Sequence, residues 1–168
     1  MKGIVKGVKK EGEMSGAMFE VFTHVDIVFY EKTRSDLHLV TETAMVDSFD
    51  VLRTRFDTIA YASYFCELVS AFTEVHDRHE LVFHLLEVAF RYLPVLSPAK
   101  VACLFEIKLL REVGLLPKLP LKEAPEGQGA LFSVVAGGIV SQEEAGKLND
   151  AVRLSDGAVR ILRYFASR

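Results

Sequence analysis

The alternation of apolar and polar residues changes character near residue 47. Before this point apolar positions recur at every second residue, in "MFEVFTHVDIVFYE" (18–31) and again in "LHLVTETAMV" (37–46), with the polar run "KTRSD" between them. Two alternating segments joined by a short polar run predict a β-hairpin. The opening "GIVKGVKK" (3–10) predicts a further strand. Residues 1–47 are therefore expected to form a small β unit.

After residue 47 the apolar positions follow a helical period, which predicts helices over about 48–73, 77–93 and 98–113. The first is apolar on almost every side in "IAYASYFCELVSAF", which is typical of a buried helix. The third has the clearest boundaries, with Ser97 as N-cap, Pro98 as first helical residue and Gly114 as stop signal.

A second β-type element interrupts the helical half at "LFSVVAGGIVSQEEAG" (131–146). Two short apolar runs around a glycine pair predict a hairpin at about 130–141. Ser141 and Glu144 have the S-x-x-E spacing of a capping box, and Ser155 is expected to cap a last helix. The sequence thus predicts an α+β protein, with a β unit over 1–47 and a mainly helical domain over 48–168.

Composition limits the class of protein. Half of the 168 residues are apolar and 26% are charged, as in globular proteins. No apolar run approaches the roughly 20 residues that cross a bilayer, so no membrane association is expected. Two cysteines do not make a disulfide framework, which favours a cytoplasmic location. The net charge of −3 argues against a uniformly basic nucleic-acid-binding protein.

No set of residues suggests catalysis or a cofactor. His79 and His84 form H-E-x-x-x-H, and a spacing of five places them on different helix faces, where they cannot share one metal ion. His24 and His38 are expected to be surface residues on strands. The sequence lacks a glycine-rich phosphate loop, and both cysteines are expected to be buried. An enzyme is therefore not predicted.

The lysines of the opening segment are the strongest candidate site. Lys2, Lys6 and Lys10 are spaced by four, so in a strand they share one face. Lysines on a small β unit suit single-stranded nucleic acid when aromatic residues lie nearby. The aromatic candidates are Phe22, Phe29 and Tyr30. A solvated edge strand protected by lysines explains the same pattern, and the residues alone leave both interpretations open.

A second basic set lies on the predicted third helix. Lys100, Lys108 and Arg111 fall within about 80° of arc on a helix. This stripe could bind an acidic peptide or phosphate groups, although a solvated helix face is the simpler interpretation.

Several longer stretches resemble, in order, the bacterial recombination mediator family RecO: "IAYASYFCELVSAFTE", "LFEIKLLREVGLLP" and "FSVVAGGIV". The segments before residue 50 are similar to the later strands of the family's N-terminal OB-fold. The resemblance implies a non-enzymatic DNA repair protein that binds single- and double-stranded DNA and promotes annealing. It also implies two partners, RecR and the acidic C-terminal tail of single-strand-binding protein, in loading a recombinase.

By this resemblance Lys6, Lys9 and Lys10 are the expected DNA contacts, together with Lys2 and, in the hairpin loop, Arg34. The stripe on the third helix would serve the acidic tail. The alternative function is a helical protein-interaction module that docks that tail or RecR and does not bind DNA.

The sequence departs from the family pattern in two ways. The opening OB strands and the closing helices have no counterpart, so a partial barrel is expected, from a fragment, a misassigned start or a reduced paralogue. Many members also carry a CxxC…CxxC zinc knuckle. Its second pair falls here on Ser141 and Glu144 and its first near Lys122 and Pro125, which predicts a metal-free hairpin with a helix cap in place of the metal.

Overall fold

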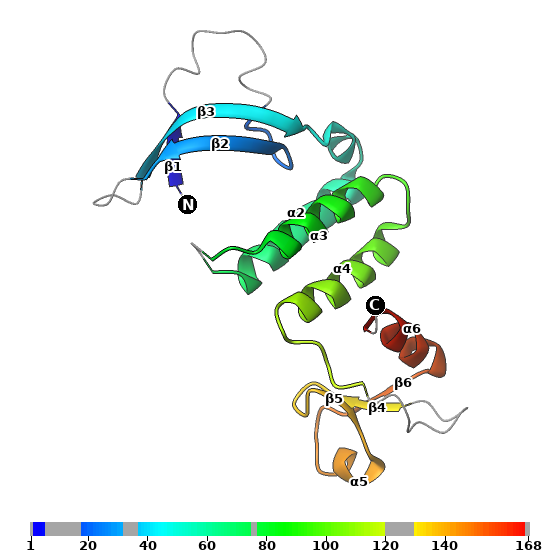
Figure 1. Cartoon of the computed structure of the whole chain (residues 1–168). Coiled ribbons are helices and arrows are strands. Elements are labelled where there is room, and N and C mark those ends of the chain that lie inside the picture. Colours follow the sequence, from blue (N-terminus) through cyan, green and yellow to red (C-terminus); the bar gives the residue numbers. More distant parts are fainter. Residues whose placement is uncertain (1, 6–17, 32–36, 75–76, 120–129, 167–168) are drawn as a thin grey trace. The chain divides into compact units, whose positions relative to one another are not determined.

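The computed structural model describes residues 2–5, 18–31, 37–74, 77–119 and 130–166 (Figure 1). Contacts divide the chain into two compact units, Met1–Ala102 and Cys103–Arg168. The predicted change from strand to helix falls at Asp47, where the third strand ends. The prediction that this position is also a domain boundary stays a prediction.

The first unit begins with a three-stranded sheet in the order β1-β3-β2, made of β1 (Lys2–Val5), β2 (His24–Tyr30) and β3 (Leu37–Asp47). β2 and β3 form the predicted antiparallel hairpin, and β1 pairs parallel to β3. The described strands leave this sheet open rather than closed into a barrel (Figure 1). The assignment to an OB-fold therefore stays a prediction.

The helical part of this unit does not begin as predicted. A single helix was expected from residue 48, but a 3₁₀ turn (η1, Asp50–Thr54) precedes α2 (Phe56–Phe72), and Arg55 between them is extended at φ −134° and ψ 140°. The Thr58 hydroxyl stabilises the break, because it lies within hydrogen-bonding distance of the carbonyl oxygens of Leu52 (2.7 Å) and Arg55 (2.8 Å).

α2 buries one face only. Its buried residues, Thr58, Ala62 and Phe65, recur at helical spacing, while Phe56 is 86% exposed. The prediction of a buried central helix is therefore wrong, and α2 packs instead along one stripe against α3 (Glu80–Tyr92) (Figure 1). The buried apolar residues of this unit include Leu52, Phe65, Val82, Phe90 and Leu93.

Polar contacts join the hairpin to α3. His24 on β2 lies 3.1 Å from a carboxylate oxygen of Glu87, and Arg91 lies 3.1 Å from a carboxylate oxygen of Asp47. The Arg91 guanidinium also lies 5.4 Å from the ring centre of Phe49, within cation–π range. The polar residues Glu87 and Arg91 of α3 therefore contact the hairpin and the end of β3.

α4 (Pro98–Glu112) contains the division between the units and ends as predicted, since Gly114 has a φ of +74°. The second unit holds an antiparallel sheet in the order β5-β4-β6. Its elements are β4 (Ala130–Ser133), β5 (Gly138–Val140), α5 (Gln142–Ala145), β6 (Val152–Leu154) and α6 (Asp156–Ala166).

The hairpin predicted at about 130–141 is confirmed by the pairing of β4 with β5. The Ser155 hydroxyl accepts a hydrogen bond from the Ala158 N–H (3.2 Å), so the predicted cap of the last helix is confirmed as well. The sequence did not predict β6, which is three residues long and pairs with β4.

Candidate functional site

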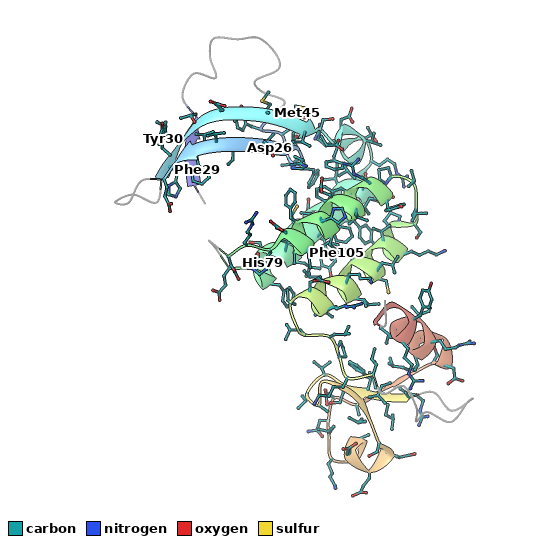
Figure 2. The ribbon with its side chains drawn as sticks, in the orientation of Figure 1. Asp26, Phe29, Tyr30, Met45, His79 and Phe105 are labelled. Atoms are coloured by element: carbon teal, nitrogen blue, oxygen red, sulfur yellow. The ribbon has the colours of Figure 1, made fainter. Side chains whose placement is uncertain are left out.

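The register of the first sheet brings the end of β1 close to two exposed aromatic side chains. Across the sheet Ile4 pairs with Leu39, which pairs with Tyr30, and the next row ends at Phe29. Neighbouring strands are about 4.8 Å apart, so the last residues of β1 lie about 10 Å from this aromatic pair. Tyr30 is 70% exposed and Phe29 is 39% exposed. Figure 2 shows both at the same end of the sheet.

Most of the predicted DNA-contact residues lie outside the part of the chain that the structure describes. Lys2 is the first residue of β1 and pairs with Leu37. Lys6, Lys9, Lys10 and Arg34 lie outside the residues that the structure describes. The lysine-rich segment therefore begins directly after β1, but its side chains are not placed.

Phe22 is not available for stacking with a base. It is half-buried at a φ of +68°, and its ring packs against Phe90 with the ring centres 5.6 Å apart. Of the three aromatic candidates, Phe29 and Tyr30 are the exposed ones.

The basic stripe of α4 is accessible. Lys100 and Arg111 are exposed and Lys108 is half-buried. A binding surface and a solvated helix face both require this exposure, so both interpretations stay open.

The strand histidines are less exposed than predicted. His38 is 6% exposed and its ring centre lies 5.6 Å from that of Phe29, while His24 is half-buried beside Glu87. The prediction of a surface residue is therefore wrong for His38, which is buried, whereas His24 keeps partial exposure beside α3. Within the part of the chain that the structure describes, no three histidine, cysteine or acidic residues are grouped as metal ligands.

The two cysteines differ from each other. Cys66 on α2 is half-buried, and this burial raises the pKa of its thiol. Cys103 on α4 is exposed, so the prediction that both thiols are buried is wrong for Cys103.

A polar network fixes the turn between β4 and β5. The hydroxyl of Ser133, which is fully buried, donates to the Asp150 carboxylate at 2.8 and 3.0 Å, and the Val135 N–H donates to the same carboxylate at 2.9 Å. The Ser133 oxygen in turn accepts a hydrogen bond from the Ala136 N–H at 3.0 Å. The Val135 N–H, followed by the Ser133 hydroxyl, holds the pKa of Asp150 below its usual value.

This network was not predictable from the sequence. Ser133 and Asp150 are 17 positions apart, and no short motif links them. The paired strands β4 and β6 bring the two residues together.

The predicted capping box at the start of α5 is confirmed. The Ser141 hydroxyl accepts a hydrogen bond from the Glu144 N–H (3.2 Å), and the Glu144 carboxylate accepts one from the Ser141 N–H (2.9 Å). This backbone hydrogen bond, with that of the Ser141 hydroxyl, lowers the pKa of Glu144. Lys122 and Pro125 lie outside the described residues, and the absence of a bound metal stays a prediction.

No helix among the described residues is long and apolar enough to cross a membrane. Residues 53–168 match the family model described as "Recombination protein O C terminal". The chain is 30% identical to the DNA repair protein RecO of Heliobacterium modesticaldum, over 98% of this chain and 62% of that protein. It is 28% identical to the protein of the same name from Symbiobacterium thermophilum, over 97% of this chain and 67% of the relative.

Proposed function

The chain belongs to the Recombination protein O family, whose C-terminal model covers residues 53–168, and from this premise we propose that it is a DNA-binding protein of recombinational repair. It would bind single- and double-stranded DNA without catalytic turnover, promote annealing and, with RecR, help to load a recombinase on DNA coated by single-strand-binding protein. The chain spans 62% of the length of the Heliobacterium relative.

The arrangement at the end of the first sheet supports this proposal. The lysine-rich segment follows β1, and β1 lies across β3 from Phe29 and Tyr30. Lysines attract phosphate groups, and exposed aromatic rings stack on unpaired bases. In this proposal the open sheet is part of an OB-fold, which is a five-stranded barrel that binds oligonucleotides through a strand face and adjacent loops.

The residues in contact with DNA phosphates would be Lys2, Lys6, Lys9, Lys10 and Arg34. The stripe of Lys100, Lys108 and Arg111 on α4 would bind the acidic tail of single-strand-binding protein in the cytoplasm.

Replacement of Tyr30 tests the stacking half of the proposal. Tyr30→Ala should weaken binding to a fluorescently labelled oligothymidylate by about 1–3 kcal/mol, the loss of one stacked base. Tyr92→Ala on α3 is the matched control, because Tyr92 is also exposed (51%) but lies outside the sheet. Equal losses of affinity in both variants, or none in either, would count against stacking on Tyr30.

A second candidate function is a protein-binding module without DNA binding, in which the accessible stripe of α4 would be the contact surface. No binding of single-stranded DNA at low salt, with retained affinity for an acidic tail peptide, would establish this alternative. Arg111→Glu should then abolish peptide binding, because the substitution reverses the charge of an exposed residue in the stripe.

A further inference from the structure

Two phenylalanines have an unusual backbone conformation at the base of the hairpin formed by β2 and β3. Among the described residues other than glycine, Phe22 and Phe49 have a positive φ, of 68° and 44°. Phe22 lies two residues before β2, and Phe49 lies two residues after β3. The left-handed region is unfavourable for a bulky side chain, so the surrounding contacts must hold each residue there. The chain therefore enters and leaves the hairpin through strained residues.

One side chain of α3 packs against both strained residues. The ring of Phe90 lies edge-on to the ring of Phe22, with the ring centres 5.6 Å apart, and to the ring of Phe49, with the centres 5.5 Å apart. Phe90 is 6% exposed and Phe49 is 8% exposed. Edge-to-face ring pairs are favourable beyond the apolar area that they bury. These two pairs oppose the backbone strain, because they form only while the base of the hairpin lies on α3.

Polar contacts repeat this arrangement at the first residue of β2 and the last residue of β3. His24 and Asp47 pair across the hairpin, and each also contacts α3. His24 lies 3.1 Å from Glu87, and Asp47 lies 3.1 Å from Arg91. These four side chains keep between 18% and 57% of their surface exposed, so water can replace each contact at small cost. The polar contacts therefore support the docked hairpin without fixing it permanently.

We propose that α3 is a latch for the hairpin, with Phe90 holding two strained hinges at Phe22 and Phe49. In the docked state, which is the one described above, both rings pack on Phe90. In the open state both ring pairs are broken, both backbones relax to a negative φ, and the hairpin moves relative to α3. Hinges are commonly a few residues at the ends of elements that absorb a change of φ and ψ. Because the two hinges share one partner, they open together.

The latch does not rest on the proposed DNA binding. It uses the base of the hairpin, where His24 pairs with Asp47, whereas Phe29 and Tyr30 lie at the other end of β2. Opening of the latch is measured without DNA. Failure of one idea therefore leaves the other to its own test.

Hydrogen exchange of the full chain, followed by mass spectrometry, tests the proposal. Residues 18–24 and 45–52 should be protected to the same degree and less than α2 and α3, because opening leaves the helices folded. Phe90→Leu keeps an apolar side chain but removes both ring pairs, so it should accelerate exchange of both segments about tenfold or more. Val82→Ala is the matched control. Val82 is also buried on α3 (3% exposed), and its truncation should accelerate exchange of the helices at least as much as that of the two segments.

Single substitutions at the hinges distinguish one latch from two separate contacts. Phe22→Leu should accelerate exchange over residues 45–52, and Phe49→Leu should accelerate it over residues 18–24, because each substitution weakens the shared contact with α3. Phe19→Ala is the control. It removes an exposed ring (48%) three residues before Phe22 and should leave exchange over residues 45–52 unchanged.

Any of three results would overturn the latch. The first is that each hinge substitution accelerates exchange of its own segment alone. The second is that Phe90→Leu leaves the exchange of both segments unchanged. The third is that both segments exchange at the rate of the helices, which would mean that the hairpin leaves α3 only when the whole unit unfolds. Circular dichroism spectra would show that each variant keeps its helices.

Discussion

At the scale of single residues, Gly137 and Gly138 are adjacent but are required for different reasons. Gly137 has a φ of +72°, the left-handed conformation that glycine adopts without strain. Gly138 permits a close approach, because a Cβ atom there would lie 2.3 Å from the carbonyl oxygen of Lys118. The main chain of Lys118 forms hydrogen bonds with the residues on both sides of Gly138. Its N–H donates to the Gly137 carbonyl (2.8 Å), and its carbonyl accepts from the Ile139 N–H (3.0 Å).

Alanine substitutions should separate these two roles. Gly137→Ala should lower the free energy of unfolding by about 1 kcal/mol, the cost of a left-handed alanine with no close neighbour. Gly138→Ala should lower it by about 2–3 kcal/mol, because the backbone at Lys118 must move. Urea denaturation of both variants measures the difference, and an equal or smaller loss for Gly138→Ala would refute the close approach.

The capping box makes a prediction at Ser141. Ser141→Ala removes the acceptor of the Glu144 N–H and should lower the free energy of unfolding by about 1 kcal/mol. Gln142→Ala, at a neighbouring exposed position of α5, is the control and should have little effect. If the two variants unfold at the same urea concentration as the unaltered protein, the cap does not stabilise the turn.

At the scale of elements, local signals were predictable from the sequence and long-range contacts were not. Ser155 and the pair Ser141–Glu144 form hydrogen bonds with neighbours within one helical turn, so the starts of these helices were predictable from local spacing. The break before α2 depends on Thr58, whose hydroxyl contacts carbonyl groups of the preceding turn. That contact has no sequence signature, because an isolated threonine is common within helices.

The same difference applies to the contacts between elements. The hydrogen bond of Ser133 to Asp150 spans 17 positions, and that of His24 to Glu87 spans 63. The candidate site was predictable to the extent that Phe29 and Tyr30 lie on an alternating strand next to a basic segment. The pairing of β1 with β3, which places these parts two strands apart, required the structure.

The turn between β4 and β5 should weaken in acid. Because hydrogen bonds lower the pKa of the folded Asp150, its stabilising effect is present above the unfolded pKa and is lost as the pH falls through the folded value, below about pH 4. Asp150→Asn should therefore destabilise the protein at neutral pH and reduce its acid sensitivity. Urea denaturation at neutral pH and below about pH 4 measures the free energy of unfolding of both proteins. Glu143→Gln, which removes an equal charge on exposed α5, should keep the pH dependence of the unaltered protein.

At the scale of the whole molecule, the family match and the candidate DNA interface fall on different parts of the chain. The family model begins at residue 53, after the sheet of β1, β2 and β3, whereas the similarity to the Heliobacterium relative covers 98% of the chain. Membership in the family therefore does not by itself test DNA binding by the sheet. The proposal of DNA binding by the sheet depends on the lysines that follow β1.

The salt dependence of single-stranded DNA binding is the most direct test. Each phosphate contact contributes about −0.7 to the slope of log affinity against log salt, so replacing Lys6, Lys9 and Lys10 by alanine should reduce the slope by about 2 and weaken binding at low salt. Lys147→Ala is the control, because Lys147 already pairs with Glu143 at 3.1 Å in the second unit. An unchanged slope in the triple variant, or no DNA binding by the unaltered chain at low salt, would contradict the account.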